Sequence, residues 1–152
     1  MSGQGSGRPA LVLDVPSRTE FLALVRDVTR RMAEIAGFDG ALAEQLALAV
    51  DEAVTNVIEH AYAGARDRRI ELRFDERGED LRVEVVDEGT AVDPRTVPQV
   101  DLRRYASERR KGGLGVHLMG RIMDTVTFRR AGRANVCCMV KRKPGAHRGA
   151  AS

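Results

Sequence analysis

The strongest constraint on the fold is an apolar pattern with helical spacing in the middle of the chain. Its positions recur every three or four residues: Leu42, Leu46, Val50, Val54, Val57 and Ala61. This spacing places their side chains on one face of an α-helix. Asp39 precedes the pattern and can cap the helix, because its carboxylate can accept from the first backbone N–H groups. We therefore predict a long amphipathic helix that runs to about Tyr62.

A strand and a shorter helix are predicted before this long helix. The run from Leu11 to Val15 alternates as a short strand does, and Pro16-Ser17 offers a helix start. An apolar pattern then continues from Phe21 to Met32 with helical spacing, and Gly37 is expected to end that helix.

The pattern changes to a period of two after the long helix. Arg69–Asp75 and Leu81–Val86 alternate around a turn near Arg77-Gly78, which predicts a β-hairpin. No periodicity is sustained over residues 88–111, so a long loop with at most a helical turn is expected there. Further elements complete the pattern: a helix over Val116–Met123 and strands over Thr125–Arg130 and Val136–Lys141.

One domain between two irregular ends is expected. With 152 residues, 43% of them hydrophobic, the chain can build a single contiguous core. Residues 1–9 are rich in Gly and Ser, and residues 144–152 form a basic tail, so both ends are expected to be disordered or flexible. Neither a membrane span nor the apolar core of a secretory signal is present in the sequence, which predicts a cytoplasmic protein without a membrane partner.

Composition also gives little support to metal or nucleic-acid chemistry. Cys137 and Cys138 are adjacent in an apolar run and the histidines lack ligand spacing, so we expect no transition-metal site. The net charge of +3 comes partly from the tail, and aromatic residues make up only 4% of the chain. We expect no direct nucleic-acid contact, because few rings are available for base stacking. Strong, steeply salt-dependent DNA binding would revive that alternative.

The first candidate site residues are Glu52 and Asn56, which share a face of the long helix. They are four residues apart, lie outside its apolar stripe and have the small side chains of Ala49 and Ala53 beside them. A flat group could approach there. The carboxylate could accept a proton from an attacking hydroxyl, and the amide oxygen could bind magnesium. The alternative is that both side chains decorate a solvated helix face.

Asp87 and Gly89 form the second candidate cluster, at the end of an apolar strand. A carboxylate there can accept a hydrogen bond from an amino group such as the one that adenine carries. A glycine two residues later lets the backbone come close to a ring. An ordinary turn at the end of a strand is the alternative.

The third cluster is a glycine-rich segment that runs directly into a helix, Lys111-Gly112-Gly113-Leu114-Gly115. Backbone N–H groups and the helix dipole favour phosphate at such a place. The segment matches neither the Walker pattern nor a dinucleotide fingerprint, and a flexible hinge is the alternative. Arg109 and Lys111 could lower the electrostatic cost of bringing a triphosphate close, or could be part of a solvated charge run. His117 could contact phosphate or be satisfied by the backbone.

In this order the three clusters resemble the N, G1 and G2 boxes of GHKL ATPases. Within that superfamily the sequence is most similar to RsbW-like anti-sigma factor kinases, on Asp51-Glu52-Ala53-Val54-Thr55-Asn56, His60-Ala61-Tyr62, Asp93-Pro94 and Gly112–Gly115. The resemblance spans about Leu11 to Lys143. It implies the α/β (α+β) two-layer sandwich of the GHKL, or Bergerat, ATP-binding fold, with a mixed sheet covered on one face by helices. The domain would span residues 10–143, with a lid at about 96–111.

The resemblance also implies the roles of the candidate residues. Asn56 would hold magnesium, Ala53 would lie beside the nucleotide, Asp87 would read adenine, Gly113–Gly115 would wrap the phosphates, and Glu52 would activate a serine of a partner protein. ATP and Mg²⁺ are the implied cofactors. Two positions depart from the family pattern. Ala91 stands where a second glycine is often found, and Asn135 is the candidate for the role of a late-strand threonine near adenine.

The implied function is that of a serine/threonine protein kinase and anti-sigma regulator. It would phosphorylate a STAS-type anti-anti-sigma protein and otherwise sequester a sigma factor. A homodimer is also implied, with the first helix and the neighbouring sheet edge as contact surfaces. The alternative is a binding module that holds ATP but transfers phosphate slowly or never, and the departure at Ala91 keeps it open.

Overall fold

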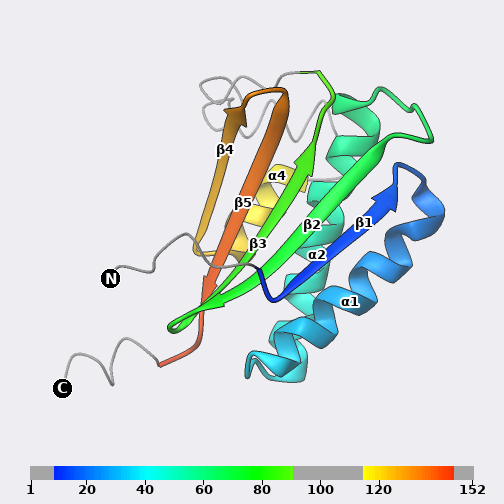
Figure 1. The fold of residues 1–152 in the computed structure, drawn as a ribbon. Helices are drawn as coiled ribbons and strands as arrows, with labels where there is room; N and C mark the ends of the chain where they lie inside the picture. The colour runs from blue at the N-terminus through cyan, green and yellow to red at the C-terminus, as the bar shows by residue number, and fades with distance from the viewer. Residues whose placement is uncertain (1–8, 91–114, 146–152) are drawn as a thin grey trace.

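Two layers make up the fold, a sheet and a set of helices that cover one of its faces (Figure 1). The computed structural model describes residues 9–90 and 115–145, with the side chains of residues 115–117 left out. The strands are β1 (Leu11–Pro16), β2 (Arg69–Arg77), β3 (Asp80–Asp87), β4 (Thr125–Ala131) and β5 (Ala134–Arg142). The helical segments are η2 (Thr19–Phe21), α1 (Leu22–Ile35), α2 (Gly40–Asn56), η3 (Val57–Ala61) and α4 (Gly115–Ile122).

The sheet has the strand order β1-β2-β3-β5-β4, and each of its neighbouring pairs is antiparallel. The two-layer sandwich is confirmed, but the expectation of a mixed sheet is wrong. Two helices, α1 and α2, connect β1 to β2 and return the chain to the same end of the sheet, so these strands run in opposite directions. In the described residues α4 precedes β4, and β4 runs parallel to β3. β5 lies between them and pairs antiparallel with both.

The start of α1 differs from the prediction. β1 continues through Pro16, and α1 begins only at Leu22 after the short 3₁₀ turn η2. Ser17 is buried and does not cap the helix. Its hydroxyl donates to Ala65 O (2.5 Å) and accepts from Arg68 N (3.0 Å). Ser17 therefore ties the end of β1 to the connection before β2, a contact between segments that local sequence patterns do not reveal.

The long central helix begins where the sequence predicts. Asp39 caps α2, since its carboxylate accepts from Leu42 N at 2.8 Å. The last turn of the predicted helix is different: residues 57–61 wind as the π-helix η3, in which Tyr62 N donates to Val57 O at 2.9 Å. A π-turn is wider than an α-turn and often lies at a functional site. The helix thus changes winding directly after Asn56.

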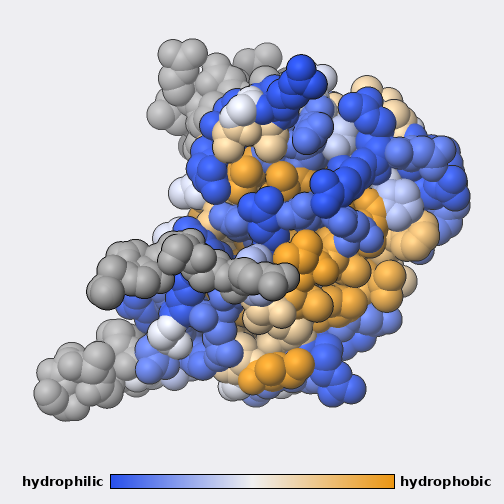
Figure 2. All heavy atoms as spheres, in the orientation of Figure 1, coloured by the Kyte–Doolittle hydropathy of each residue, from blue (hydrophilic) through white to orange (hydrophobic). Residues whose placement is uncertain are grey.

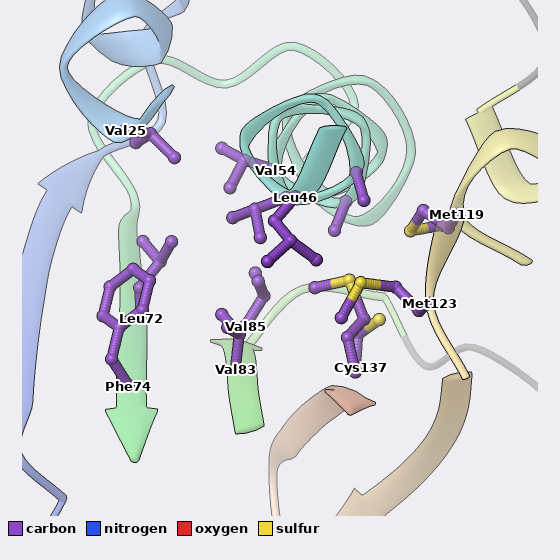
Figure 3. Close-up of a cluster of buried hydrophobic side chains, with 14 of the residues drawn as sticks. Val25, Leu46, Val54, Leu72, Phe74, Val83, Val85, Met119, Met123 and Cys137 are labelled. Atoms are coloured by element: carbon purple, nitrogen blue, oxygen red, sulfur yellow. The ribbon is translucent and has the colours of Figure 1, made fainter. Parts of the chain in front are cut away.

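The core lies between α2 and the inner face of the sheet. Figure 3 shows Leu46 of α2 pointing toward Val83 and Val85 of β3, and Met123 lying beside Cys137 of β5. The inner positions of the strands are buried, in keeping with their period of two. In the described part of the chain, no helix is both long and apolar enough to cross a membrane.

The helix-free face of the sheet is charged. Ion pairs join neighbouring strands at Arg73–Glu84 (3.6 Å) and Arg142–Asp80 (3.1 Å), and Arg129 of β4 reaches across β5 to Glu84 of β3 (3.4 Å). Hydrophilic side chains gather over much of the face seen in Figure 2. The candidate site residues must be sought on the other face, where the helices pack.

Candidate functional site

The acid and the amide of the first cluster lie one helical turn apart on α2. Glu52 and Asn56 are both half-buried, and Ala49 and Ala53 beside them are buried. Oε1 of Glu52 is inaccessible to solvent. This environment differs from that of Glu44, an acid two turns earlier on the same helix, which is exposed.

The neighbouring acid, Asp51, points in another direction and has a structural role. Its carboxylate accepts from Arg26 Nη1 of α1 at 2.5 Å and from Thr55 Oγ1 at 3.1 Å. Asp51 is buried, so these partners offset the loss of water around its charge. The two consecutive acids therefore divide their roles: Asp51 joins α1 to α2, and Glu52 is left on the face of Asn56.

Asp87, the acid of the second cluster, is a buried carboxyl at the end of β3, 4% exposed. Its Oδ1 accepts from Gly89 N and from Asn135 Nδ2, each at 2.8 Å. Burial raises the pKa of Asp87, while these hydrogen bonds and the charge of Arg130 act in the opposite direction. Among the described residues, the hydrogen bonds to this carboxyl all end on Oδ1, so Oδ2 is the oxygen that can accept from a ligand.

Asn135 is the cross-strand partner of Asp87 and lies on β5. Its amide nitrogen donates to Asp87 Oδ1 and also to Thr90 O at 3.0 Å, while its Oδ1 accepts from Arg130 Nη1 at 2.9 Å. The structure thus brings Asn135 and Asp87 together, two residues that the sequence analysis had placed separately beside adenine. Arg130 was missed. The register of the β4–β5 hairpin could have found it, because Arg130 pairs with Asn135 across that hairpin.

Gly89 is required by a close approach to the end of η3. A Cβ at this position would lie 2.3 Å from Ala61 O and 2.9 Å from Ala61 Cβ. The next residue, Thr90, donates its N–H to the same Ala61 O at 2.8 Å. The close approach for which a glycine was predicted is therefore made, in the described residues, to the helical segment that follows Asn56.

Tyr62 adds a second link between these segments. Its hydroxyl accepts from Glu88 N at 2.8 Å and donates to Arg69 O at 2.6 Å. Ala61 and Tyr62 entered the sequence analysis as the end of a helical pattern and as part of a family resemblance. In the structure they hold the backbone on both sides of Gly89, so they fix the place of Asp87 relative to α2.

The glycine-rich cluster is only partly described. Gly115 is the first residue of α4, as predicted for a segment that opens a helix, and α4 packs against α2. Several predicted positions lie outside the described residues: Ala91, Asp93-Pro94, the lid at about 96–111, Arg109, Lys111, Gly112, Gly113 and Leu114. The side chain of His117 also lies outside them.

A separate hollow of about 770 Å³ lies at the opposite end of the sheet, near Asp80 rather than Asp87. Its acids already have partners within the chain. Arg142 pairs with Asp80 at 3.1 Å, and Asp124 accepts from Arg142 N at 2.6 Å. The described residues of the first two clusters lie at the other end, where β3 and β5 meet the end of α2.

The class of protein follows from the sandwich fold and from the acid that ends β3 beside the end of α2. A family model described as a histidine kinase-like ATPase domain matches residues 15–141. The chain is a histidine kinase-like ATP-binding domain of the GHKL type.

Individual relatives identify the family within this class. The chain is 35% identical over 120 residues to the serine-protein kinase RsbW of Listeria monocytogenes, and the alignment covers 76% of each chain. It is 33% identical over 119 residues to RsbW of Bacillus subtilis, covering 75% of this chain and 74% of that protein. The chain belongs to the RsbW family of serine-protein kinases.

Solved structures share the fold at lower sequence identity. A chain of the SiaB–SiaC complex of Pseudomonas aeruginosa matches with a TM-score of 0.61 and 13% identity, covering 88% of this chain and 89% of that chain. The RsbU and RsbW domains of a Mycobacterium tuberculosis protein match with a TM-score of 0.59 and 19% identity. The match covers 88% of this chain but only 32% of that longer one. At these identities the likeness concerns the fold alone.

Proposed function

We propose that this protein is an ATP-dependent serine/threonine kinase that phosphorylates a STAS-type anti-anti-sigma protein and otherwise binds a sigma factor. The observation that carries the proposal is the half-buried Glu52, held one turn from Asn56 on the helix that also anchors the Asp87 segment. Relatives named as serine-protein kinase RsbW support the choice of a protein hydroxyl as acceptor. The homodimer implied by the family resemblance and a cytoplasmic location, where ATP is available, belong to the same proposal.

The described residues fit Mg-ATP by the chemistry of their donors and acceptors. Asp87 Oδ2 can accept from the exocyclic amine of adenine, the amide oxygen of Asn56 suits Mg²⁺, and the small Ala53 leaves room beside them. We assign the phosphates to the helix start at Gly115 and to the segment before it, Arg109, Lys111, Gly112, Gly113 and Leu114. The bound nucleotide supplies the γ-phosphoryl group, and the metal would neutralise part of its charge.

Glu52 acts as the general base in this proposal. Its carboxylate takes the proton of the serine hydroxyl as the serine oxygen bonds to the γ-phosphorus, and the bond from that phosphorus to the departing ADP breaks. Asp51 does not compete for this role, because it is already paired with Arg26.

The second candidate is an ATP-dependent binding module without efficient transfer. It is favoured by one feature: the contacts around Asp87, Gly89 and Asn135 are complete without Glu52. Nucleotide binding could therefore persist where transfer does not.

The test is phosphate transfer from labelled ATP to a purified STAS-type partner. We expect Glu52→Gln to lower the transfer rate by about a hundredfold or more, because a general base contributes roughly that much. The dissociation constant for ATP, measured by calorimetry, should change less than threefold. The matched control is Glu44→Gln on the same helix. It removes an exposed pair with Arg30 and should transfer at the wild-type rate.

Unchanged transfer by Glu52→Gln would contradict the assignment of the base. Measurable ATP binding by the wild-type protein with no transfer would contradict the kinase and establish the binding module.

A further inference from the structure

Arg130 lies on β4, at the edge of the sheet, and is connected to the carboxyl of Asp87 through one residue, Asn135. Its Nη1 donates to Asn135 Oδ1 at 2.9 Å, and its Nε donates to Gly132 O at 3.1 Å. Asn135 in turn donates to Asp87 Oδ1 at 2.8 Å. These hydrogen bonds form a chain from β4 through β5 to the end of β3.

The direction of this chain is fixed by the chemistry of its first member. A guanidinium has only donors, whereas a side-chain amide has one acceptor oxygen and one donor nitrogen. Of the two polar atoms of the Asn135 amide, Arg130 can therefore donate only to the oxygen. This contact holds the amide with its nitrogen toward Asp87 and Thr90 O, and it prevents the flipped orientation in which the oxygen would face the carboxylate.

The orientation of Asn135 determines which oxygen of Asp87 can read a base. Asn135 Nδ2 and Gly89 N both donate to Oδ1, which has two acceptor sites. The ligand then meets Oδ2, a pure acceptor when Asp87 is ionised. Such an oxygen selects a base that presents an N–H donor at that point.

We propose that Arg130 is a positioning residue that sets base specificity. Acting through Asn135, it holds Asp87 so that Oδ2 selects a purine that carries a 6-amino group. The inference rests on the nucleotide site proposed above. Arg130 does not touch the nucleotide, so its effect is on discrimination between bases more than on the phosphates.

Arg130 is also the charged side chain that acts on Asp87 among the described residues. Tyr62 and Cys137 are the other titratable groups that interact with Asp87. Burial raises the pKa of both, that of Cys137 to about 12, so they stay neutral near pH 7. Removing the cation would favour protonation of Asp87. As the pH is lowered, binding of the adenine amine would then be lost at a higher pH than in the wild type.

The experiment compares ATP with purine riboside triphosphate, which lacks only the 6-amino group. Dissociation constants would be measured by calorimetry without a partner protein. We expect the wild-type protein to prefer ATP and Arg130→Ala to lose at least tenfold of that preference. In Arg130→Ala the loss of ATP binding on acidification should begin at a higher pH. Arg130→Lys keeps a donor and a charge, and should recover part of the preference.

The matched control is Arg129→Ala. Arg129 is the preceding arginine of β4, but it lies on the opposite face and pairs with Glu84 at 3.4 Å. It should behave as the wild type, which separates the effect of Arg130 from a general loss of charge or strand stability. An unchanged preference in Arg130→Ala, or an equal loss in both variants, would overturn the inference. A wild-type protein that binds both triphosphates equally would overturn it too. A wild-type protein that binds neither would overturn the proposed function itself.

Discussion

At the scale of single residues, Asp87 is placed where folding and the nucleotide binding proposed above would make opposite demands on one carboxyl. Burial raises the pKa of Asp87. Its neutral form is therefore favoured in the folded protein, and the stability that this provides is lost as the pH rises through the raised pKa. Accepting an amine needs the ionised form, so ATP binding is lost as the pH falls through the same value. Above this raised pKa the carboxyl is in the form that the proposed binding needs, and the stability gained from its neutral form has been lost.

Asp87→Asn tests this conflict. The amide oxygen can keep both hydrogen bonds now made to Oδ1, while an NH₂ group replaces Oδ2 and opposes the adenine amine. We expect an unchanged or higher melting temperature at pH 7 and ATP binding weakened by about tenfold or more, since a hydrogen bond to a charged group contributes roughly 1.5–3 kcal/mol. Thermal denaturation and calorimetry measure the two effects. The control Asp75→Asn removes a charge that acts on Arg77 and Arg82 on the charged face of the sheet, and tenfold weaker binding in that variant as well would refute the explanation.

The candidate residues that sequence alone could propose are those whose chemistry is evident from their type and spacing. Glu52, Asn56 and Asp87 are of this kind. Arg130 and Tyr62 are not, because their roles depend on partners across a hairpin or at the far end of a connection. Ala61 contributes only its backbone carbonyl, which no side-chain pattern reports.

At the scale of elements, the joint between η3 and the end of β3 connects the two halves of the candidate site. Ala61 O accepts a hydrogen bond from Thr90 N, and the Tyr62 hydroxyl accepts one from Glu88 N. Gly89, between Glu88 and Thr90, lies against Ala61. Through this joint the helix that carries Glu52 and Asn56 is attached to the strand that carries Asp87. The relative position of the groups proposed for catalysis and for adenine recognition depends on these few contacts.

Gly89→Ala should disturb this joint. The added methyl would lie 2.3 Å from Ala61 O, so the backbone must move and the contact from Thr90 is lost. We expect a loss of about 1–3 kcal/mol in the free energy of unfolding, as for other overpacked sites, together with weaker ATP binding. Denaturant titration and calorimetry measure both.

Gly120→Ala is the control for that substitution. Gly120 lies in α4 with nothing within 4 Å of an added Cβ, so the change should be neutral or should stabilise the helix by up to about 1 kcal/mol. Full ATP affinity and stability in Gly89→Ala would show that the close approach at this joint is dispensable.

Element boundaries were predictable where local chemistry sets them. Asp39 caps α2 as expected, and the strands of the hairpin fall close to the predicted ranges. The late start of α1 and the π-winding of η3 were not predictable, because distant backbone groups determine them: Ala65 and Arg68 for Ser17, and Thr90 for Ala61.

At the scale of the whole molecule, nucleotide binding should be visible as stability. A ligand present at 100 times its dissociation constant stabilises the folded state by about 2.7 kcal/mol. For a domain of this size, that free energy corresponds to a rise in melting temperature of roughly 5–10 °C. We expect Mg-ATP to produce such a shift in the wild type and in Glu52→Gln, and a much smaller one in Asp87→Asn. Differential scanning fluorimetry measures it, and an equal shift in Asp87→Asn would contradict the role given to that carboxyl.

The layered architecture could be expected from the order of helical and alternating patterns together with the family resemblance. The strand directions could not, because they depend on how many helices lie between neighbouring strands and on the position of β5 in the sheet. Local periodicity in the sequence predicts neither of these properties.

The π-helix also limits how the length of this chain can vary. Its i→i+5 contact from Tyr62 to Val57 accommodates one residue more than an α-turn would. Deleting a single codon within 57–61 can therefore restore regular α-winding and leave the residues beyond in nearly the same orientation. A deletion within α2, which has no extra residue to lose, would instead rotate everything beyond by about 100° around the helix axis and turn Ala61 away from Thr90. Changes of length should be tolerated in 57–61 and in the surface turn at Arg77-Gly78, and be selected against within α2.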